Sequence, residues 1–203
     1  MKQEELNGIM KQHKAWLKGK FGGERADLQG ADLHHARLQD ADLQGAILRH
    51  SILEDSDLQG AILRGAILED SHLQGAILRQ SDLRQSDLQS AILEDSELQG
   101  ADLRGALLQH SNLRGAGLRH SDLRGADLDY ASWPLWCGSL KAYVDDRIAI
   151  QLLYHTLSVV QHSPYVSEEV KAKLLTPEIV SLANRFHRVG ECMKIKEWEE
   201  GTK

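Results

Sequence analysis

Several features that mark common protein classes are scarce in this chain of 203 residues. Its two cysteines, Cys137 and Cys192, are too few for a disulfide framework and are expected to be free thiols. No apolar run of about eighteen residues occurs, and the N-terminus lacks the apolar core of a signal peptide. These absences predict a cytoplasmic protein that is neither secreted nor inserted in a membrane.

Motifs for catalysis and metal binding are also missing. The sequence shows no glycine-rich phosphate-binding loop and no pair of catalytic carboxylates. His155, His187, Cys137 and Cys192 could be combined around zinc, but none has the short ligand spacing of a structural zinc site. We therefore expect no enzyme, no cofactor and no metal. A helical tail with catalytic or metal-binding activity stays as an alternative, which metal analysis of the purified protein would test.

Leucine at fixed spacing is what the chain has in abundance. From Leu28 to Leu128 a leucine falls on every fifth position, and the residue two places before each is alanine or serine. This period fits neither an α-helix nor a strand with alternating side chains. All the leucines point inward only if the chain turns by about 90° with each repeat, so that four repeats close a square coil. Residues 26–131 are therefore predicted to form a quadrilateral β-solenoid.

The repeat unit carries a resemblance to a known family. Ala-Asp-Leu-Xaa-Gly at 41–45 and 101–105 resembles the repeat of the pentapeptide repeat family, and the segments around Trp16 and from Trp133 to Leu140 resemble the flanks of its bacterial members. The resemblance implies a right-handed quadrilateral β-helix. The expected fold is thus an all-β solenoid with an N-terminal cap helix and a C-terminal α-helical domain.

The N-terminal segment, residues 1–25, is predicted to be a capping helix and a linker. An amphipathic helix over residues 3–20 is expected, with Leu6, His13 and Trp16 on its apolar stripe. The stripe would cover the open edge of the first coil, which would otherwise invite aggregation. The lysines of this helix also allow a membrane-surface role, which we favour less.

Residues 132–203 are predicted to form a C-terminal α-helical domain for capping and dimerisation. Helices are expected over 140–161, from Ser167, and from Thr176 to about Val189. Their apolar surface exceeds what the end of one coil needs, which predicts a homodimer. The residues assigned to the cap and the dimer contact are Trp133, Trp136, Leu140, Val144, Ile148, Leu152 and Phe186.

The outward positions of the repeats determine what the surface can bind. The formal net charge is −6, and the repeats contain an excess of acid and no lysine. One outward face holds four aspartates just before its leucines and four arginines just after them, and their fields are expected to cancel. These eight residues, called here the aspartate and arginine column, are Asp42, Asp82, Asp102, Asp122, Arg64, Arg84, Arg104 and Arg124. Ile47 and Ile67 stack on another face. They either suit the extended backbone or form a contact surface.

Two kinds of function fit these observations. The first is a non-enzymatic scaffold that acts through its surface on an unidentified protein partner. The second, implied by the resemblance, is a DNA mimic that modulates DNA gyrase or another type II topoisomerase. The mixed charge of the aspartate and arginine column favours the first. The excess of acid also argues against direct binding to nucleic acid, whose phosphates would repel it.

Overall fold

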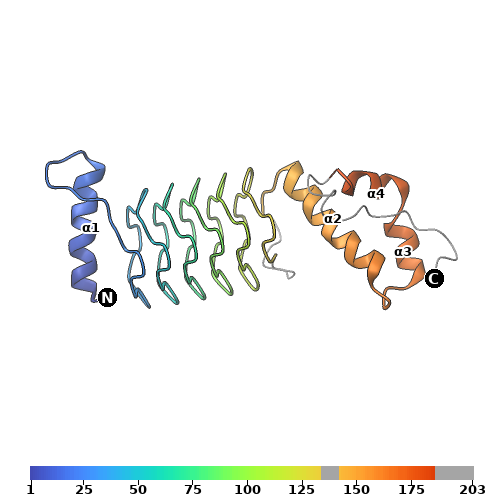
Figure 1. Ribbon diagram of the computed structural model, residues 1–203, viewed down its shortest axis with the longest axis horizontal. Helices are drawn as coiled ribbons and strands as arrows, with labels where there is room; N and C mark the ends of the chain where they lie inside the picture. The colour runs from blue at the N-terminus through green and yellow to red at the C-terminus, as the bar shows by residue number, and fades with distance from the viewer. Residues whose placement is uncertain (134–141, 186–203) are drawn as a thin grey trace. The chain divides into compact units, whose positions relative to one another are not determined.

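The computed structural model describes residues 1–133 and 142–185 and divides the chain into two compact units, Met1–Tyr143 and Val144–Lys203. The first unit contains helix α1 (Gln3–Leu17) followed by a stack of coils (Figure 1). The second contains α2 (Asp146–His162), α3 (Glu168–Leu174) and α4 (Pro177–Ala183).

Parallel β-bridges fix the register of the coils. They join residues twenty positions apart, from Asp27 with Ile47 to Asn112 with Ser132. Four repeats therefore make one coil, as the sequence predicts. Within the described residues each repeat contributes a single bridge residue, the one before its leucine, and the backbone between bridges forms turns rather than continuous strands. Figure 1 shows the coils stacked face to face.

Backbone hydrogen bonds hold each coil to the next and close each corner. The Leu43 N–H donates to the Ile62 carbonyl over 2.8 Å, and the Ile62 N–H donates to the Ala41 carbonyl over 2.9 Å. At the corner the Ala46 N–H donates to the Leu43 carbonyl, around Gly45 with φ 68°. A positive φ at the third position is typical of type II turns. Among the described residues, twelve other than glycine also adopt a positive φ, all of them at corners of the coils.

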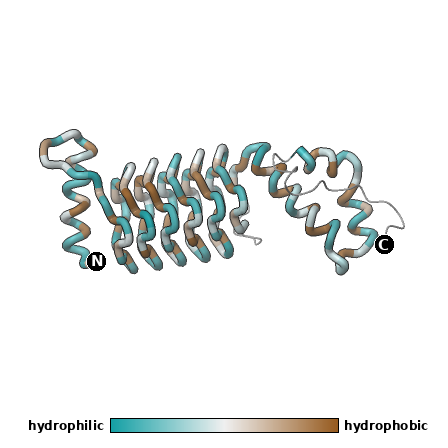
Figure 2. Tube along the Cα trace, in the orientation of Figure 1, coloured by the Kyte–Doolittle hydropathy of each residue, from teal (hydrophilic) through white to brown (hydrophobic). Residues whose placement is uncertain are grey.

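The interior of the coils consists of the leucines and the small residues. Every leucine at the five-residue spacing, from Leu28 to Leu128, is at most 4% exposed, and apolar residues recur from coil to coil in Figure 2. Buried serine hydroxyls donate to the carbonyl of the leucine three residues earlier, as Ser86 does to Leu83 over 2.7 Å. The serines that do so are Ser51, Ser56, Ser71, Ser81, Ser86, Ser96 and Ser121. Ser111 is the exception, because its buried hydroxyl has no hydrogen-bond partner.

Helix α1 contacts the first coil through a buried histidine. His13 is fully buried, stacks on Trp16 with ring centroids 5.4 Å apart, and accepts a hydrogen bond from the Ala26 N–H at Nδ1 over 3.0 Å. Burial lowers the pKa of His13, and the Asp42 carboxylate partly opposes that shift. The helix ends at Leu17, three residues before the predicted end, and Gly19 then adopts a φ of 61°.

The repeat register continues beyond its predicted end at residue 131. Ser132 bridges Asn112, and Tyr143 returns to the stack to bridge Asp122. The prediction of a helix from residue 140 is wrong at this point, because Tyr143 lies in a β-bridge and Val144 precedes the helix. Helix α2 begins at Asp146, since the Asp145 side chain caps it by accepting the Ile148 N–H over 3.0 Å.

The second unit packs α3 and α4 against α2. Their shared core consists of Tyr154, Leu157, Val160, Leu175, Val180 and Ala183. Ser167 and Thr176 cap α3 and α4, and Pro177 occupies the first turn of α4, as predicted. Helix α4 ends at Ala183, before the predicted end near Val189.

Candidate interaction surface

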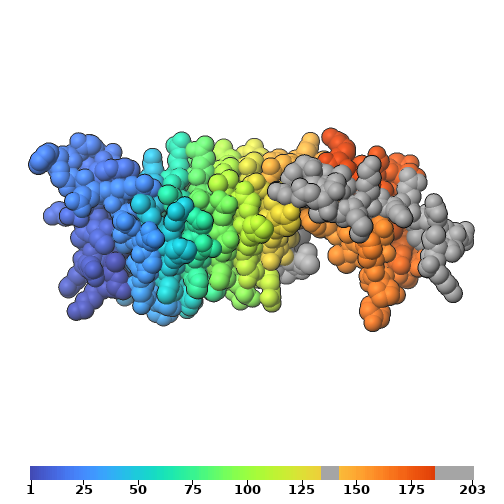
Figure 3. Space-filling view, in the orientation of Figure 1, coloured from blue at the N-terminus to red at the C-terminus, as the bar shows by residue number. Residues whose placement is uncertain are grey.

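The fixed register sorts the outward side chains onto four faces. We number the faces in chain order: face 1 contains Leu28 and every twentieth residue after it, face 2 begins with Leu33, face 3 with Leu38 and face 4 with Leu43. The outward residues before and after each leucine belong to the same face. In Figure 3 the side chains of successive coils touch over the visible surface.

The surplus negative charge of the repeats lies on two adjacent faces. Faces 1 and 2 together contain eleven carboxylates and only two arginines, Arg49 and Arg114, whereas faces 3 and 4 together contain seven of each. The carboxylates are Asp27, Asp32, Glu54, Asp55, Glu69, Asp70, Asp87, Glu94, Asp95, Asp127 and Asp129. Among them Asp129 is buried. We call faces 1 and 2 the acidic faces.

Face 4 contains the aspartates and arginines that the sequence places in one column. Six of them form an arginine–aspartate ladder: Asp82, Arg84, Asp102, Arg104, Asp122 and Arg124. Arg84 donates two hydrogen bonds to Asp82, over 2.8 and 2.5 Å, and its Nε lies 3.5 Å from Asp102 in the next coil. Arginine hydrogen bonds lower the pKa of all three aspartates. The predicted neutralisation is confirmed for this ladder.

The other members of the column lie outside the ladder. Asp42 precedes Gln44, whose N–H it accepts over 3.3 Å, and Arg64 follows Ile62 instead of an aspartate. The predicted cancellation of charge therefore describes face 4 and not the repeats as a whole. The acidic faces could have been predicted from sequence by summing the outward charges of each of the four faces at the twenty-residue period, rather than those of face 4 alone.

The acidic faces are only partly neutralised. Arg49 pairs with Glu69 over 2.7 Å on face 1, and Arg114 lies 3.7 Å from Glu94 on face 2. His34 contacts Asp32 over 2.8 Å and Glu54 over 3.1 Å, and the hydrogen bond with Asp32 raises the pKa of this histidine. A cleft of about 330 Å³ on face 2 is lined by Glu54, Asp55, Gln74, Gly75, Glu94 and Asp95.

The predicted aliphatic residues do not form one long stripe. Ile47 and Ile67 pair by a β-bridge on face 1 and are partly buried, but Asp87 follows them in the same row. The more exposed Ile62 and Leu107 lie on faces 4 and 1, each 38% exposed. On face 1 the row of consecutive aliphatic residues is thus limited to two coils.

The residues predicted to cap the coils and form a dimer lie in different environments. Ile148 is buried, while Trp133, Val144 and Leu152 are partly buried. Trp136, Leu140 and Phe186 lie outside the described residues, as do Cys137, His187 and Cys192.

The described part of the chain contains no group of three or more histidine, cysteine, aspartate or glutamate residues arranged to hold a metal ion.

Among the helices that the structure describes, none combines the length and the apolarity needed to cross a lipid bilayer.

Comparison with known proteins shows the family of this chain. A family model described as pentapeptide repeats (8 copies) matches the chain three times, over residues 26–65, 66–105 and 101–132. The chain therefore belongs to the pentapeptide repeat family, and membership implies that the coils form a right-handed β-helix. No curated protein sequence matches the chain.

Solved structures of other family members are similar to this chain. HetL, a pentapeptide repeat protein involved in heterocyst differentiation regulation from the cyanobacterium Nostoc sp. strain PCC 7120, is 30% identical over 59% of this chain and 60% of HetL, with a TM-score of 0.37. The plasmid-mediated fluoroquinolone resistance protein QnrB1 is 19% identical over 66% of this chain and 71% of its own, with a TM-score of 0.41. The match thus spans less than two thirds of HetL.

Proposed function

We propose that this protein is a non-catalytic scaffold whose acidic faces bind a positively charged segment of a protein partner. The observation that carries the proposal is the distribution of charges: besides the buried Asp129, faces 1 and 2 have ten carboxylates and two arginines, whereas faces 3 and 4 have equal numbers. A surface with one sign of charge steers an oppositely charged partner and sets its orientation. The proposal also places this protein in the cytoplasm and includes no direct binding to nucleic acid.

The cleft on face 2 supplies a place for basic side chains. Glu54 and Asp55 lie one coil before Gln74 and Gly75, and Glu94 and Asp95 lie one coil after them. Gly75 has no side chain, and the Asp55 carboxylate lies over its backbone at one side of the cleft. A lysine or arginine placed there would form charge-assisted hydrogen bonds, which are shorter and stronger than neutral ones.

A matched pair of variants tests this proposal. The first replaces the four cleft carboxylates with amides: Glu54→Gln, Asp55→Asn, Glu94→Gln and Asp95→Asn. The control removes the same number of charges from faces 3 and 4: Asp40→Asn, Asp42→Asn, Asp57→Asn and Glu97→Gln. Binding of a fluorescent lysine-rich peptide is measured by anisotropy at about 0.15 M salt.

The scaffold proposal expects different results from the two variants. The cleft variant should weaken peptide binding by at least about tenfold, whereas the control should change it by about twofold or less, because short-range ion pairs act mainly within a Debye length. Equal losses in both variants would mean that the peptide responds only to net charge.

Modulation of a type II topoisomerase by DNA mimicry is the second candidate. The specific observation that favours it is the concentration of surplus carboxylates on two adjacent faces, which offers an acidic surface to a DNA-binding groove. A gyrase supercoiling assay with increasing protein tests it. The mimic predicts that the wild type and the control variant change supercoiling and that the cleft variant has lost the effect. An unchanged assay at tens of micromolar protein would exclude it.

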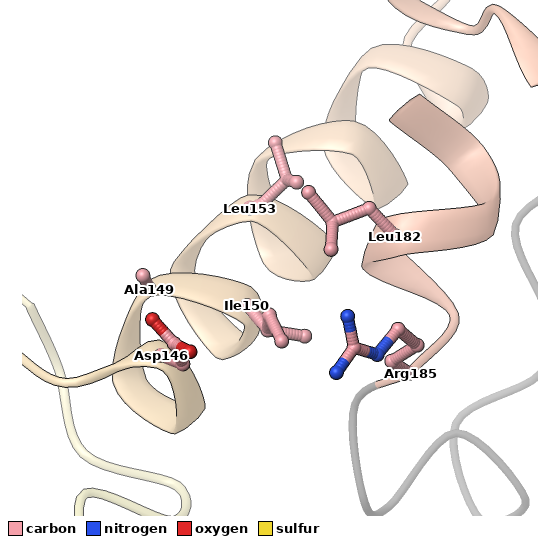
Figure 4. A pocket seen from close by; sticks show the side chains of 6 residues that line it. All are labelled: Asp146, Ala149, Ile150, Leu153, Leu182 and Arg185. Carbon is pink, nitrogen blue, oxygen red and sulfur yellow. The ribbon is translucent and has the colours of Figure 1, made fainter. Parts of the chain in front are cut away.

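A homodimer through the second unit is also proposed. Helices α2 and α4 enclose a pocket of about 260 Å³ lined by Asp146, Ala149, Ile150, Leu153, Leu182 and Arg185. Leu153 and Leu182 point toward one another in this pocket (Figure 4), and Leu182 is 42% exposed. Covering such apolar area contributes about 25 cal/mol per Å². A second copy of the chain would cover it.

Light scattering tests the dimer. The intact chain should weigh twice its 22.7 kDa, and a chain truncated after Gly138 should be monomeric. Leu182→Gln should weaken the dimer, while Ser181→Gln, at the neighbouring exposed position, should leave it intact. A monomeric wild type at tens of micromolar would contradict the proposal.

A further inference from the structure

Three arginines of face 4 line a hollow that is separate from the acidic faces. It has a volume of about 210 Å³ and is lined by Arg64, Arg84, Gln85 and Arg104. The three arginines occupy equivalent positions in consecutive coils, each twenty residues from the next. Since stacked coils repeat at about 4.8 Å, their side chains leave the backbone at that spacing.

Arginines rather than carboxylates form the outer layer of this surface. The Arg84 side chain is 38% exposed and the side chain of its partner Asp82 is 23% exposed. The carboxylate uses Nε and one terminal nitrogen of the guanidinium, and a guanidinium has five N–H donors. Each arginine of the ladder therefore keeps donors for a further acceptor.

Arg64 adds an unbalanced charge at one side of the hollow. Ile62 stands where Asp82 and Asp102 precede the other two arginines. Three arginines therefore line the hollow, while only two of them have a carboxylate at the position before their leucine. The Arg64 side chain is also exposed.

We infer that Arg64, Arg84 and Arg104 bind a tetrahedral oxyanion with two negative charges, of the phosphate class. Guanidinium groups on neighbouring coils, about 4.8 Å apart at the backbone, can donate to different oxygens of one such anion. The side-chain amide of Gln85 supplies a neutral donor at the rim. The site lies on a face whose formal charges balance, so it is independent of the basic partner proposed for the acidic faces.

An NMR titration tests this site. The arginine Nε–H signals of the full-length, ¹⁵N-labelled protein are followed as inorganic phosphate replaces chloride at constant ionic strength. A saturable shift should appear at Arg64, Arg84 and Arg104. Arg64→Gln should weaken the apparent affinity about tenfold, the effect expected for one charge-assisted hydrogen bond. Arg119→Gln, at the equivalent position on face 3, should change it by less than about twofold.

A second variant tests the role of the missing carboxylate. Ile62→Asp gives Arg64 the neighbour that Arg84 has in Asp82, with all arginines retained. It should weaken phosphate binding about tenfold because the new carboxylate cancels the unbalanced positive charge at Arg64 and repels the anion. Shifts that do not saturate, equal effects of Arg64→Gln and Arg119→Gln, or unchanged binding by Ile62→Asp would each overturn the inference.

A parallel titration with glycerol phosphate identifies the source of the anion. Tighter binding of glycerol phosphate assigns the site to a phosphate ester of a larger molecule, and tighter binding of inorganic phosphate assigns it to the free ion.

Discussion

Two inward-facing serines allow a sharp test of how the interior of the coils is stabilised. Ser86 and Ser111 both precede a leucine by two residues, a position that is alanine in other repeats. Both are buried, but only the Ser86 hydroxyl donates a hydrogen bond, to the Leu83 carbonyl over 2.7 Å. The Ser111 hydroxyl has no partner. Because alanine fits the same position elsewhere, Ser→Ala changes at both sites should leave the backbone undisturbed.

The two substitutions should change the free energy of unfolding in opposite directions. Ser111→Ala removes a buried polar group without a partner and should raise the free energy of unfolding by about 1–3 kcal/mol. Ser86→Ala removes a hydrogen bond and should lower it by about 0.5–1.5 kcal/mol. The loss at Ser86 stays small because the Leu83 carbonyl still accepts the Ser86 N–H over 3.2 Å. The free energies of unfolding of the two variants should therefore differ by about 1.5–4.5 kcal/mol.

Urea unfolding followed by far-ultraviolet circular dichroism measures this difference. For a chain of this length 1 kcal/mol corresponds to a Tm change of roughly 2–4 °C, so thermal unfolding should rank Ser111→Ala above the wild type and Ser86→Ala below it. If Ser111→Ala destabilises the protein as much as Ser86→Ala does, the Ser111 hydroxyl is hydrogen-bonded and the reasoning is refuted.

Other parts of the structure give three more predictions. Leu83→Ala should lower the free energy of unfolding by about 2–5 kcal/mol, because the hydrogen-bonded coils on both sides limit collapse of the cavity that the substitution leaves. Urea unfolding measures this loss, and a loss below about 1 kcal/mol would contradict the prediction. Burial lowers the pKa of His13, so the contact that this residue makes between α1 and the first coil is fully stabilising above about pH 6.5 and weakens as the pH falls below that value. The hydrogen-exchange protection of the Ala26 amide should therefore decrease between about pH 7.5 and 5.5, and His13→Gln should remove that dependence. Hydrogen bonding to Arg84 lowers the pKa of Asp82, so this ion pair stabilises the fold fully above about pH 4, and its contribution is lost as the pH falls through the lowered pKa. Arg84→Gln should therefore reduce the acid-dependent loss in the free energy of unfolding by about 0.2–1 kcal/mol, and an unchanged loss on acidification would count against the ladder.

The sequence predicts the coil register because burial alone determines it. A leucine on every fifth position can be buried throughout only if four repeats close a coil, and the bridges from Asp27 to Ser132 have that period. The serine hydrogen bonds also follow, since a buried hydroxyl must find a backbone acceptor. Ser111 could not be distinguished from the other serines, because its lost hydrogen bond depends on local rotamer geometry that the repeat pattern does not record.

The junction between the coils and α2 was harder to predict, because the same spacing of apolar residues fits both a helix and the last part of the coil stack. Tyr143, Val144 and Ile148 fit one side of a helix, yet Tyr143 pairs with Asp122 as part of the coil stack. Asp145 was the available signal, since an aspartate before an apolar periodic segment often caps a helix. The acidic faces were missed for a different reason: the charges of only one face were compared, whereas the charge distribution of a solenoid depends on the outward positions of all four faces.

The twenty-residue coil gives this protein a surface reading frame. Adding or removing one five-residue repeat preserves the leucine interior but turns every later outward side chain by a quarter of a coil. Deleting residues 66–70, for example, would move Arg84 from face 4 to face 3 and leave Arg64 behind. The segment at 43–49 recurs in identical sequence at 58–64, a shift of three repeats, so the copies lie on different faces. Insertion or deletion of one repeat, without any substitution, can therefore change which charged side chains are neighbours on the surface.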